Sequence, residues 1–132
     1  KVTGVQTCAL PIFTLCKSDL FAGKMSAILF RAWKGRVKGR DWYDLIWYIQ
    51  NKVPISLIYL ESCMKQAGHL LPEETLSQNQ LIQMLQEKIQ SIDWESAKAD
   101  MYSFITDPER LNIWSPAFFL ELIEHLVFEK TS

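Results

Sequence analysis

The 132-residue chain has a formal net charge of −1, with 48% hydrophobic and 12% aromatic residues. This composition excludes a disordered or fibrous protein and suits one globular domain with a modest core. No apolar run approaches the roughly 18 to 20 residues that a membrane span requires, so no membrane association is expected. The three cysteines form no Cys-x-x-Cys pair, which indicates neither a disulfide framework nor a zinc site and favours the cytoplasm.

The charges are divided unevenly along the chain. Residues 1–52 carry nine Lys/Arg and three acidic side chains, whereas residues 53–132 carry five and twelve. A basic half favours contact with a polyanion, although an ordinary solvated surface can also carry such charge.

The first twelve residues, KVTGVQTCALPI, have neither a helical nor a clear strand period. They resemble the translation of a sequencing adapter, and we expect the native sequence to begin near Phe13. A short apolar strand over residues 8–15 is the alternative. The chain also lacks an initiator Met, which indicates part of a longer protein.

From residue 13 onward, caps and breakers predict an all-α fold, a bundle of about six helices in one domain over residues 13–132. Ser18 is expected to cap a first helix over residues 20–33. A second helix runs from about 41 to 51 and must stop before Pro54, because proline disfavours helical backbone in the residue before it.

Four further helices are predicted over residues 56–67, 77–90, 93–105 and 117–128. Their signals are Gly68 as a left-handed terminator, Ser77 with Gln80 as a capping box, Asp93 as a cap, and proline in the first turn after Asp107 and Ser115. The apolar stripes of the last helix and of the helix over 77–90 are expected to pack into a core.

One stretch, residues 20–48, concentrates unusual features. Lys24, Ala27 and Arg31 share one helical face. Five cations then occur within ten residues without an acid among them, namely Arg31, Lys34, Arg36, Lys38 and Arg40. Together with the glycines between them, they suit phosphate binding, while a solvated loop is the plainer interpretation.

Asp41, Asp44 and Tyr48 follow at spacing i, i+3, i+7 and therefore share a face of the second helix, beside a buried stripe formed by Trp42, Leu45, Ile46 and Ile49. Two carboxylates next to a basic loop can form a structural salt-bridge network, or they can belong to a site where a carboxylate accepts a proton. Asp41 also suits the start of a helix, where the dipole favours an acid.

These motifs read FAGKMSAILFR, then AWKGRVKG, then RDWYDLIWY. In this order and spacing they resemble the C-terminal motif region of the AbiEii/AbiGii nucleotidyltransferase toxin family. The resemblance continues more weakly through SIDWESAKADMYSFI and IWSPAFFLELIEHL.

The resemblance implies a toxin that uses a nucleoside triphosphate and Mg²⁺ to transfer nucleotides, with tRNA as acceptor and a cognate antitoxin encoded beside it. By this resemblance, Lys24 would contact the triphosphate. Asp41 is the first candidate for a catalytic carboxylate and Asp44 the second, and Arg31 and Arg40 would be supporting residues. The family's upstream Gly-Gly or Gly-Ser turn and its metal-binding Asp-x-Asp pair do not occur in this sequence.

We therefore expect the C-terminal part of an enzyme whose α/β catalytic core is missing, and this chain to be inactive alone. The alternative is a non-enzymatic helical module that binds RNA or a protein through its basic loop.

Overall fold

The computed structural model describes residues 16–30 and 38–129. Within these residues the fold is helical without a named strand, which confirms the all-α prediction. The elements, in chain order, are α2 (Lys17–Phe30), α3 (Gly39–Gln50), α4 (Leu57–Gln66), α5 (Gln78–Ser91), α6 (Trp94–Met101), the 3-10 helix η1 (Pro108–Ile113) and α7 (Pro116–Ile123).

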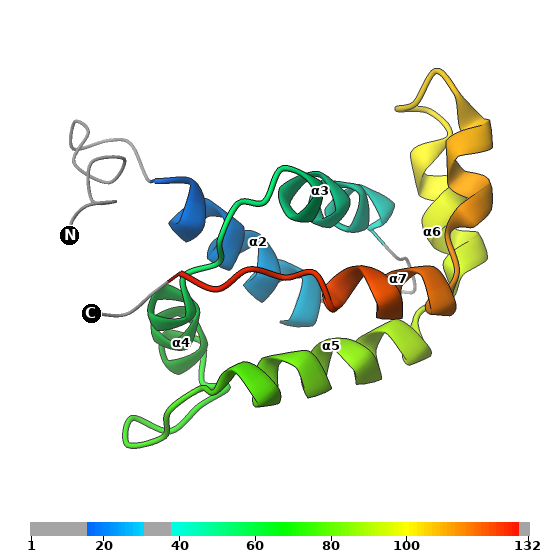
Figure 1. Cartoon of the computed structure of the whole chain (residues 1–132). Helices are drawn as coiled ribbons and strands as arrows, with labels where there is room; N and C mark the ends of the chain where they lie inside the picture. Colours follow the sequence, from blue (N-terminus) through cyan, green and yellow to red (C-terminus); the bar gives the residue numbers. More distant parts are fainter. Residues whose placement is uncertain (1–15, 31–37, 130–132) are drawn as a thin grey trace.

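Helix α2 packs against both α3 and α4, and α3 also packs against α6. Helix α7 lies between α5 and α3 (Figure 1) and packs against both of them. Helix α6 and the following segment form one end of the molecule, and α4 lies at the other. Each helix therefore contributes one face to a shared core.

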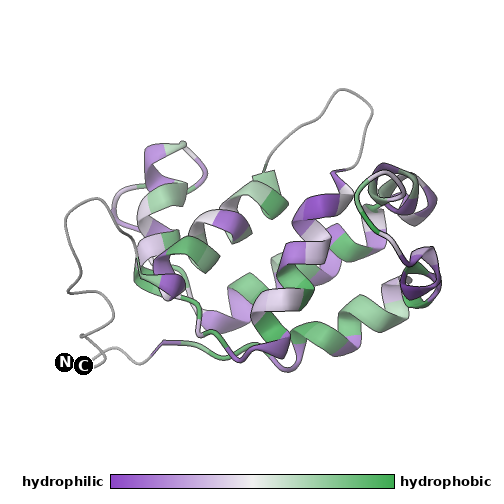
Figure 2. Ribbon diagram, turned by 90° about the horizontal axis from the view of Figure 1, so that it is seen from above, coloured by the Kyte–Doolittle hydropathy of each residue, from purple (hydrophilic) through white to green (hydrophobic). Residues whose placement is uncertain are grey.

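The core is apolar and is built from every α-helix that the structure describes. Its fully buried side chains include Phe21, Met25, Leu45, Leu60, Leu81, Leu85, Ile89, Ile123 and Phe119. Hydrophobic and hydrophilic residues alternate along the helices (Figure 2), as expected for helices with one buried face. The predicted core stripes of α3, α5 and α7 are confirmed, with Ile46 half-buried at the edge.

Most predicted helix ends are confirmed by their hydrogen bonds. The Ser56 hydroxyl accepts the Tyr59 N–H at the start of α4, and Ser77 and Gln80 form the reciprocal capping box of α5. Asp93, Asp107 and Ser115 likewise accept backbone N–H groups at the starts of α6, η1 and α7. Gly68 has φ 84°, the left-handed backbone that glycine adopts without strain.

Ser18 was expected to cap α2, and this prediction is wrong. The helix already begins at Lys17, and the Cys16 carbonyl accepts the N–H groups of Asp19 and Leu20. The Ser18 hydroxyl instead donates to Glu129 at 2.7 Å, near the other end of the sequence. Ser18 therefore bonds to a residue distant in the sequence instead of capping its own helix.

Two helices are shorter than predicted. Helix α6 ends at Met101 rather than near residue 105, and α7 ends at Ile123 rather than 128. After α7 the chain runs extended beside residue 55, where the Ile55 N–H donates to the Val127 carbonyl and the Glu129 N–H donates to the Ile55 carbonyl. The extended backbone of this isolated bridge at Phe128 is incompatible with helical backbone there, so α7 ends before it.

Cys63 of α4 is a free thiol.

Candidate functional site

Helix α2 presents Lys24 to α3. The side chains of Phe21, Met25 and Ile28 are buried on the apolar face of α2, and burying that face fixes the rotation of the helix about its axis. Lys24 lies beside this face with its side chain 25% exposed. Its ammonium group therefore reaches a neighbouring helix while keeping access to solvent.

Helix α3 meets Lys24 with two carboxylates. Burial of Trp42, Leu45 and Ile49 sets the rotation of α3, and the acids one turn apart then face α2. The Lys24 Nζ lies 2.9 Å from Asp41 Oδ1 and 3.0 Å from Asp44 Oδ2. The lysine helix and the acidic helix thus meet in one cluster, which we call the Lys24 cluster.

The two carboxylates differ in burial. The Asp41 side chain is 5% exposed and the Asp44 side chain 34% exposed. A buried carboxylate depends on its partners for charge compensation, whereas an exposed one is partly solvated. Asp41 is therefore suited to holding Lys24 in place, and Asp44 to meeting a molecule that arrives from solvent.

The environment keeps Lys24 positively charged. Burial alone would lower the pKa of its ammonium group, but the hydrogen bonds to Asp41 and Asp44 outweigh burial and raise the pKa above 10.5. Lys24 is consequently a permanent cation at neutral pH. A protonated, part-exposed ammonium group is what contact with a phosphate requires.

Tyr48 borders the Lys24 cluster. Its ring stacks on Phe21 of α2 with centroids 4.6 Å apart. Burial, followed by the charge of Asp44, raises the pKa of its hydroxyl above 10.0, so this group stays neutral. Tyr48 can donate or accept a hydrogen bond beside the cluster but carries no charge there.

The start of α3 is fixed from α6. The Gly39 N–H donates to Asp100 Oδ2 at 3.0 Å, and Gly39 packs so closely on Ala97 that a Cβ would collide with the Ala97 carbonyl oxygen. Sequence reasoning missed this contact, because nothing local connects positions 61 residues apart. It holds the helix end from which Asp41 projects.

Of the two predicted supporting arginines, Arg40 is the one that the structure describes, and its guanidinium group is directed to Phe104 and not to the Lys24 cluster. Arg40 is exposed, and its guanidinium carbon lies 5.5 Å from the ring centroid of Phe104. Arg31 lies outside the described residues, as do residues 32–37 of the predicted basic loop. The described part of the site is thus one lysine and two aspartates.

These residues do not fit a magnesium site. Residues 16–30 and 38–129 contain no group of three or more His, Cys, Asp or Glu side chains placed to hold a metal ion. The two carboxylates of the cluster are both within 3.0 Å of the Lys24 ammonium group, so a second cation would have to compete with it.

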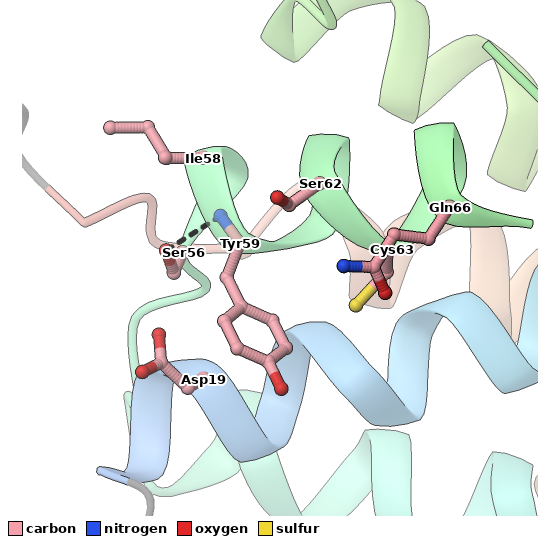
Figure 3. A pocket seen from close by; sticks show the side chains of 7 residues that line it. All are labelled: Asp19, Ser56, Ile58, Tyr59, Ser62, Cys63 and Gln66. Carbon is pink, nitrogen blue, oxygen red and sulfur yellow. Dashed lines mark hydrogen bonds between the residues drawn. The ribbon is translucent and has the colours of Figure 1, made fainter.

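A separate pocket of about 310 Å³ lies between α2 and α4 (Figure 3), and the sequence did not single it out. Its lining residues are Asp19, Ser56, Ile58, Tyr59, Ser62, Cys63 and Gln66. Burial raises the pKa of both the Asp19 carboxyl and the Cys63 thiol. None of the predicted site residues lines this pocket.

The family described as Nucleotidyl transferase AbiEii toxin, Type IV TA system matches residues 7–120. The chain belongs to this family. The match includes Lys24, Asp41 and Asp44, so the cluster built by α2 and α3 lies inside the shared region. Comparison with curated proteins and with solved structures found no match.

Membership in the AbiEii family associates the chain with nucleotidyl transfer and with a toxin-antitoxin system, and so with a nucleotide substrate and an antitoxin partner. Among the helices that the structure describes, none is long and apolar enough to cross a membrane.

Proposed function

We propose that this AbiEii chain supplies the triphosphate-binding half of a toxin that transfers nucleotides from a nucleoside triphosphate to tRNA. The observation that carries the proposal is the Lys24 cluster, with its ammonium group 2.9 Å and 3.0 Å from two carboxylates of another helix. A nucleotidyltransferase must hold a polyphosphate beside a group that can accept a proton from the attacking hydroxyl.

Lys24 is the proposed phosphate ligand. Its raised pKa keeps it charged, and its remaining exposure leaves an approach for a phosphate oxygen. The buried Asp41 would keep its ion pair with the Lys24 ammonium group, while a phosphate oxygen would replace Asp44 as the second partner of that group. The Asp44 carboxylate would then be available to accept the proton of the acceptor hydroxyl.

Both acids are therefore assigned to the active site, Asp41 by holding Lys24 and Asp44 by facing the reacting groups. Arg31, which lies outside the described residues, and Arg40 are proposed as supporting cations. Mg²⁺, when bound to the complete enzyme, would neutralise the charge of the triphosphate. We assign its ligands to the Asp-x-Asp pair of the family, which this sequence lacks.

Nucleotide binding by the 132-residue chain tests the role of Lys24. Titration with each of the four nucleoside triphosphates should show binding, and Lys24→Gln should weaken it by about tenfold or more, because a charge-assisted hydrogen bond is lost. The matched control is Lys65→Gln, since the Lys65 side chain is 27% exposed and lies 3.2 Å from Glu61. Equal affinity of Lys24→Gln and the unaltered chain would refute the assignment.

Transfer itself is tested with labelled nucleoside triphosphate, Mg²⁺ and tRNA. The chain alone is expected to label no tRNA, whereas a version extended upstream to include an Asp-x-Asp pair is expected to label it. Labelling by the chain alone would contradict its proposed inactivity. No labelling by the extended version would contradict the proposed acceptor.

The antitoxin is proposed to be encoded beside the toxin. Expression of the extended version should stop growth, and coexpression of the neighbouring gene should restore it. Growth arrest that the neighbouring gene leaves unchanged would count against this pairing.

A further inference from the structure

The solvent-facing side of α3 carries a row of exposed side chains that the Lys24 cluster does not use. Arg40, Tyr43 and Trp47 stand at spacing i, i+3, i+7 and share one helical face. Tyr43 is 37% exposed and Trp47 47% exposed. Phe104, 59% exposed, extends the row through its contact with the Arg40 guanidinium group. We call these four residues the α3 aromatic stripe.

Exposed aromatic rings at this density are unusual on a surface with no role, because each leaves a large apolar area in water. The row from Arg40 to Trp47 extends about 10 Å at the rise of an α-helix. This length matches a few stacked nucleotides of a single strand. The rings are also supported from behind, because Trp47 makes an edge contact with Tyr48 at 5.3 Å, and Tyr48 stacks on Phe21.

The charges around the α3 aromatic stripe indicate which class of ligand it would bind. The two acids of α3, Asp41 and Asp44, both lie on Lys24 and so belong to the face toward α2. The stripe itself carries Arg40, and the exposed Lys52 follows the end of α3. Asp100 of α6, near the start of α3, accepts the Gly39 N–H. Aromatic rings with cations beside them suit unpaired bases on a phosphate backbone.

We propose that the α3 aromatic stripe binds the unpaired bases of a single-stranded RNA segment. This inference rests on the proposed function, because it names where the acceptor strand approaches the Lys24 cluster. Bases would stack on Tyr43 and Trp47, and Arg40 would lie near the backbone phosphates. Asp44, which is 34% exposed, follows Tyr43 on α3 and is directed toward Lys24, so the stripe and the carboxylate proposed to accept the proton lie on adjoining faces of one helix.

The test uses the 132-residue chain and a fluorescent single-stranded RNA oligomer, with the matching duplex and single-stranded DNA as comparisons. Single-stranded RNA should bind more tightly than the duplex and at least as tightly as the DNA, and added salt should weaken binding. Trp47→Ala should reduce affinity by about tenfold, because a base-stacking surface is removed. Ile58→Ala is the control, since Ile58 is 64% exposed on α4 and lies outside the stripe.

Tyr43→Ala provides a second variant, and circular dichroism identifies any variant that has lost its helices. Wild-type affinity in both folded variants, equal binding of duplex and single strand, or a preference for DNA would overturn the proposal. Unchanged RNA binding in both variants would indicate that the stripe contacts a protein partner and not RNA. Lys24→Gln separates this inference from the proposed function, because it should weaken nucleotide binding and leave binding of the oligomer nearly unchanged.

Discussion

The Gly39 N–H of α3 donates to the Asp100 carboxylate of α6 at 3.0 Å, and the two helices touch so closely there that glycine alone fits. This contact anchors the end of α3 next to Asp41. The geometry of the Lys24 cluster therefore depends on a helix that contributes no side chain to it.

Gly39→Ala should destabilise the fold by about 1–3 kcal/mol, because its Cβ would meet the Ala97 backbone oxygen. Gly23→Ala is the matched control. It lies within α2 with nothing within 4 Å of an added Cβ, and it should stabilise by about 0.5–1 kcal/mol. Urea unfolding of both variants measures the difference. Similar effects at the two sites would show that the contact with Ala97 does not constrain α3.

The two acids of the Lys24 cluster should differ in their contribution to stability. Asp41→Asn should cost about 1.5–3 kcal/mol, because a charged hydrogen bond of a 5% exposed group is lost. Asp44→Asn should cost only about 0.2–1 kcal/mol, as for an exposed ion pair. Chemical denaturation at neutral pH, repeated with Lys24→Met as the background, isolates the coupling to the lysine. Equal losses of unfolding free energy in the two variants would show that the difference in burial does not set the strength of the two ion pairs.

The ion pairs of Lys24 should make stability depend on alkaline pH. The pKa of Lys24 is raised in the folded state, so its contribution is complete below the unfolded value of 10.5 and is lost as pH rises through the folded value. The free energy of unfolding should thus exceed that of Lys24→Met at neutral pH, and the excess should shrink above pH 10.5. An excess independent of pH would mean that packing of the lysine stem, not its charge, stabilises the fold.

For Asp19, in the pocket between α2 and α4, the charged form should destabilise the fold. Burial, and then the charge of Glu129, raise the pKa of its carboxyl above 3.8, so ionisation of Asp19 opposes folding. Asp19→Asn should increase the free energy of unfolding at neutral pH. The gain should vanish below pH 3.8, where the carboxyl is protonated in both states. A gain that persists in acid would have to come from packing.

Trp94 joins the aromatic part of the core. Its indole N–H donates to the Ile89 carbonyl at 3.0 Å, and its ring stacks on Phe119 at 4.4 Å. Trp94→Phe should cost about 1–3 kcal/mol, because a buried carbonyl loses its donor. Trp47→Phe, in the exposed α3 aromatic stripe, should stay within about 0.5 kcal/mol. Thermal or urea unfolding compares the two, and a harmless Trp94→Phe would show that water replaces the lost donor.

Local signals predicted much of the fold. The capping box at Ser77 and Gln80, the cap at Asp93 and the terminator Gly68 all act within a few residues, so their chemistry is visible in the sequence. Helical spacing also placed Asp41 and Asp44 on one face, and in the structure both carboxylates lie within 3.0 Å of the Lys24 ammonium group.

The errors occur where a distant segment competes with a local one. Ser18 donates to Glu129 instead of capping α2, and α7 stops early because the chain after it pairs with Ile55. The Gly39 contact with Asp100 is of the same kind. Such partners are set by packing, which spacing along the chain does not report.

By itself the sequence determined that the chain is helical, that Lys24 and the two aspartates lie on the faces of successive helices, and that their motifs resemble a toxin nucleotidyltransferase. Only the tertiary structure decided that these faces meet, that Asp41 is buried while Asp44 reaches solvent, and that Arg40 turns to Phe104. The physical reason is that helical periodicity fixes directions around one axis, whereas the distance between two side chains on different helices depends on how the whole core packs.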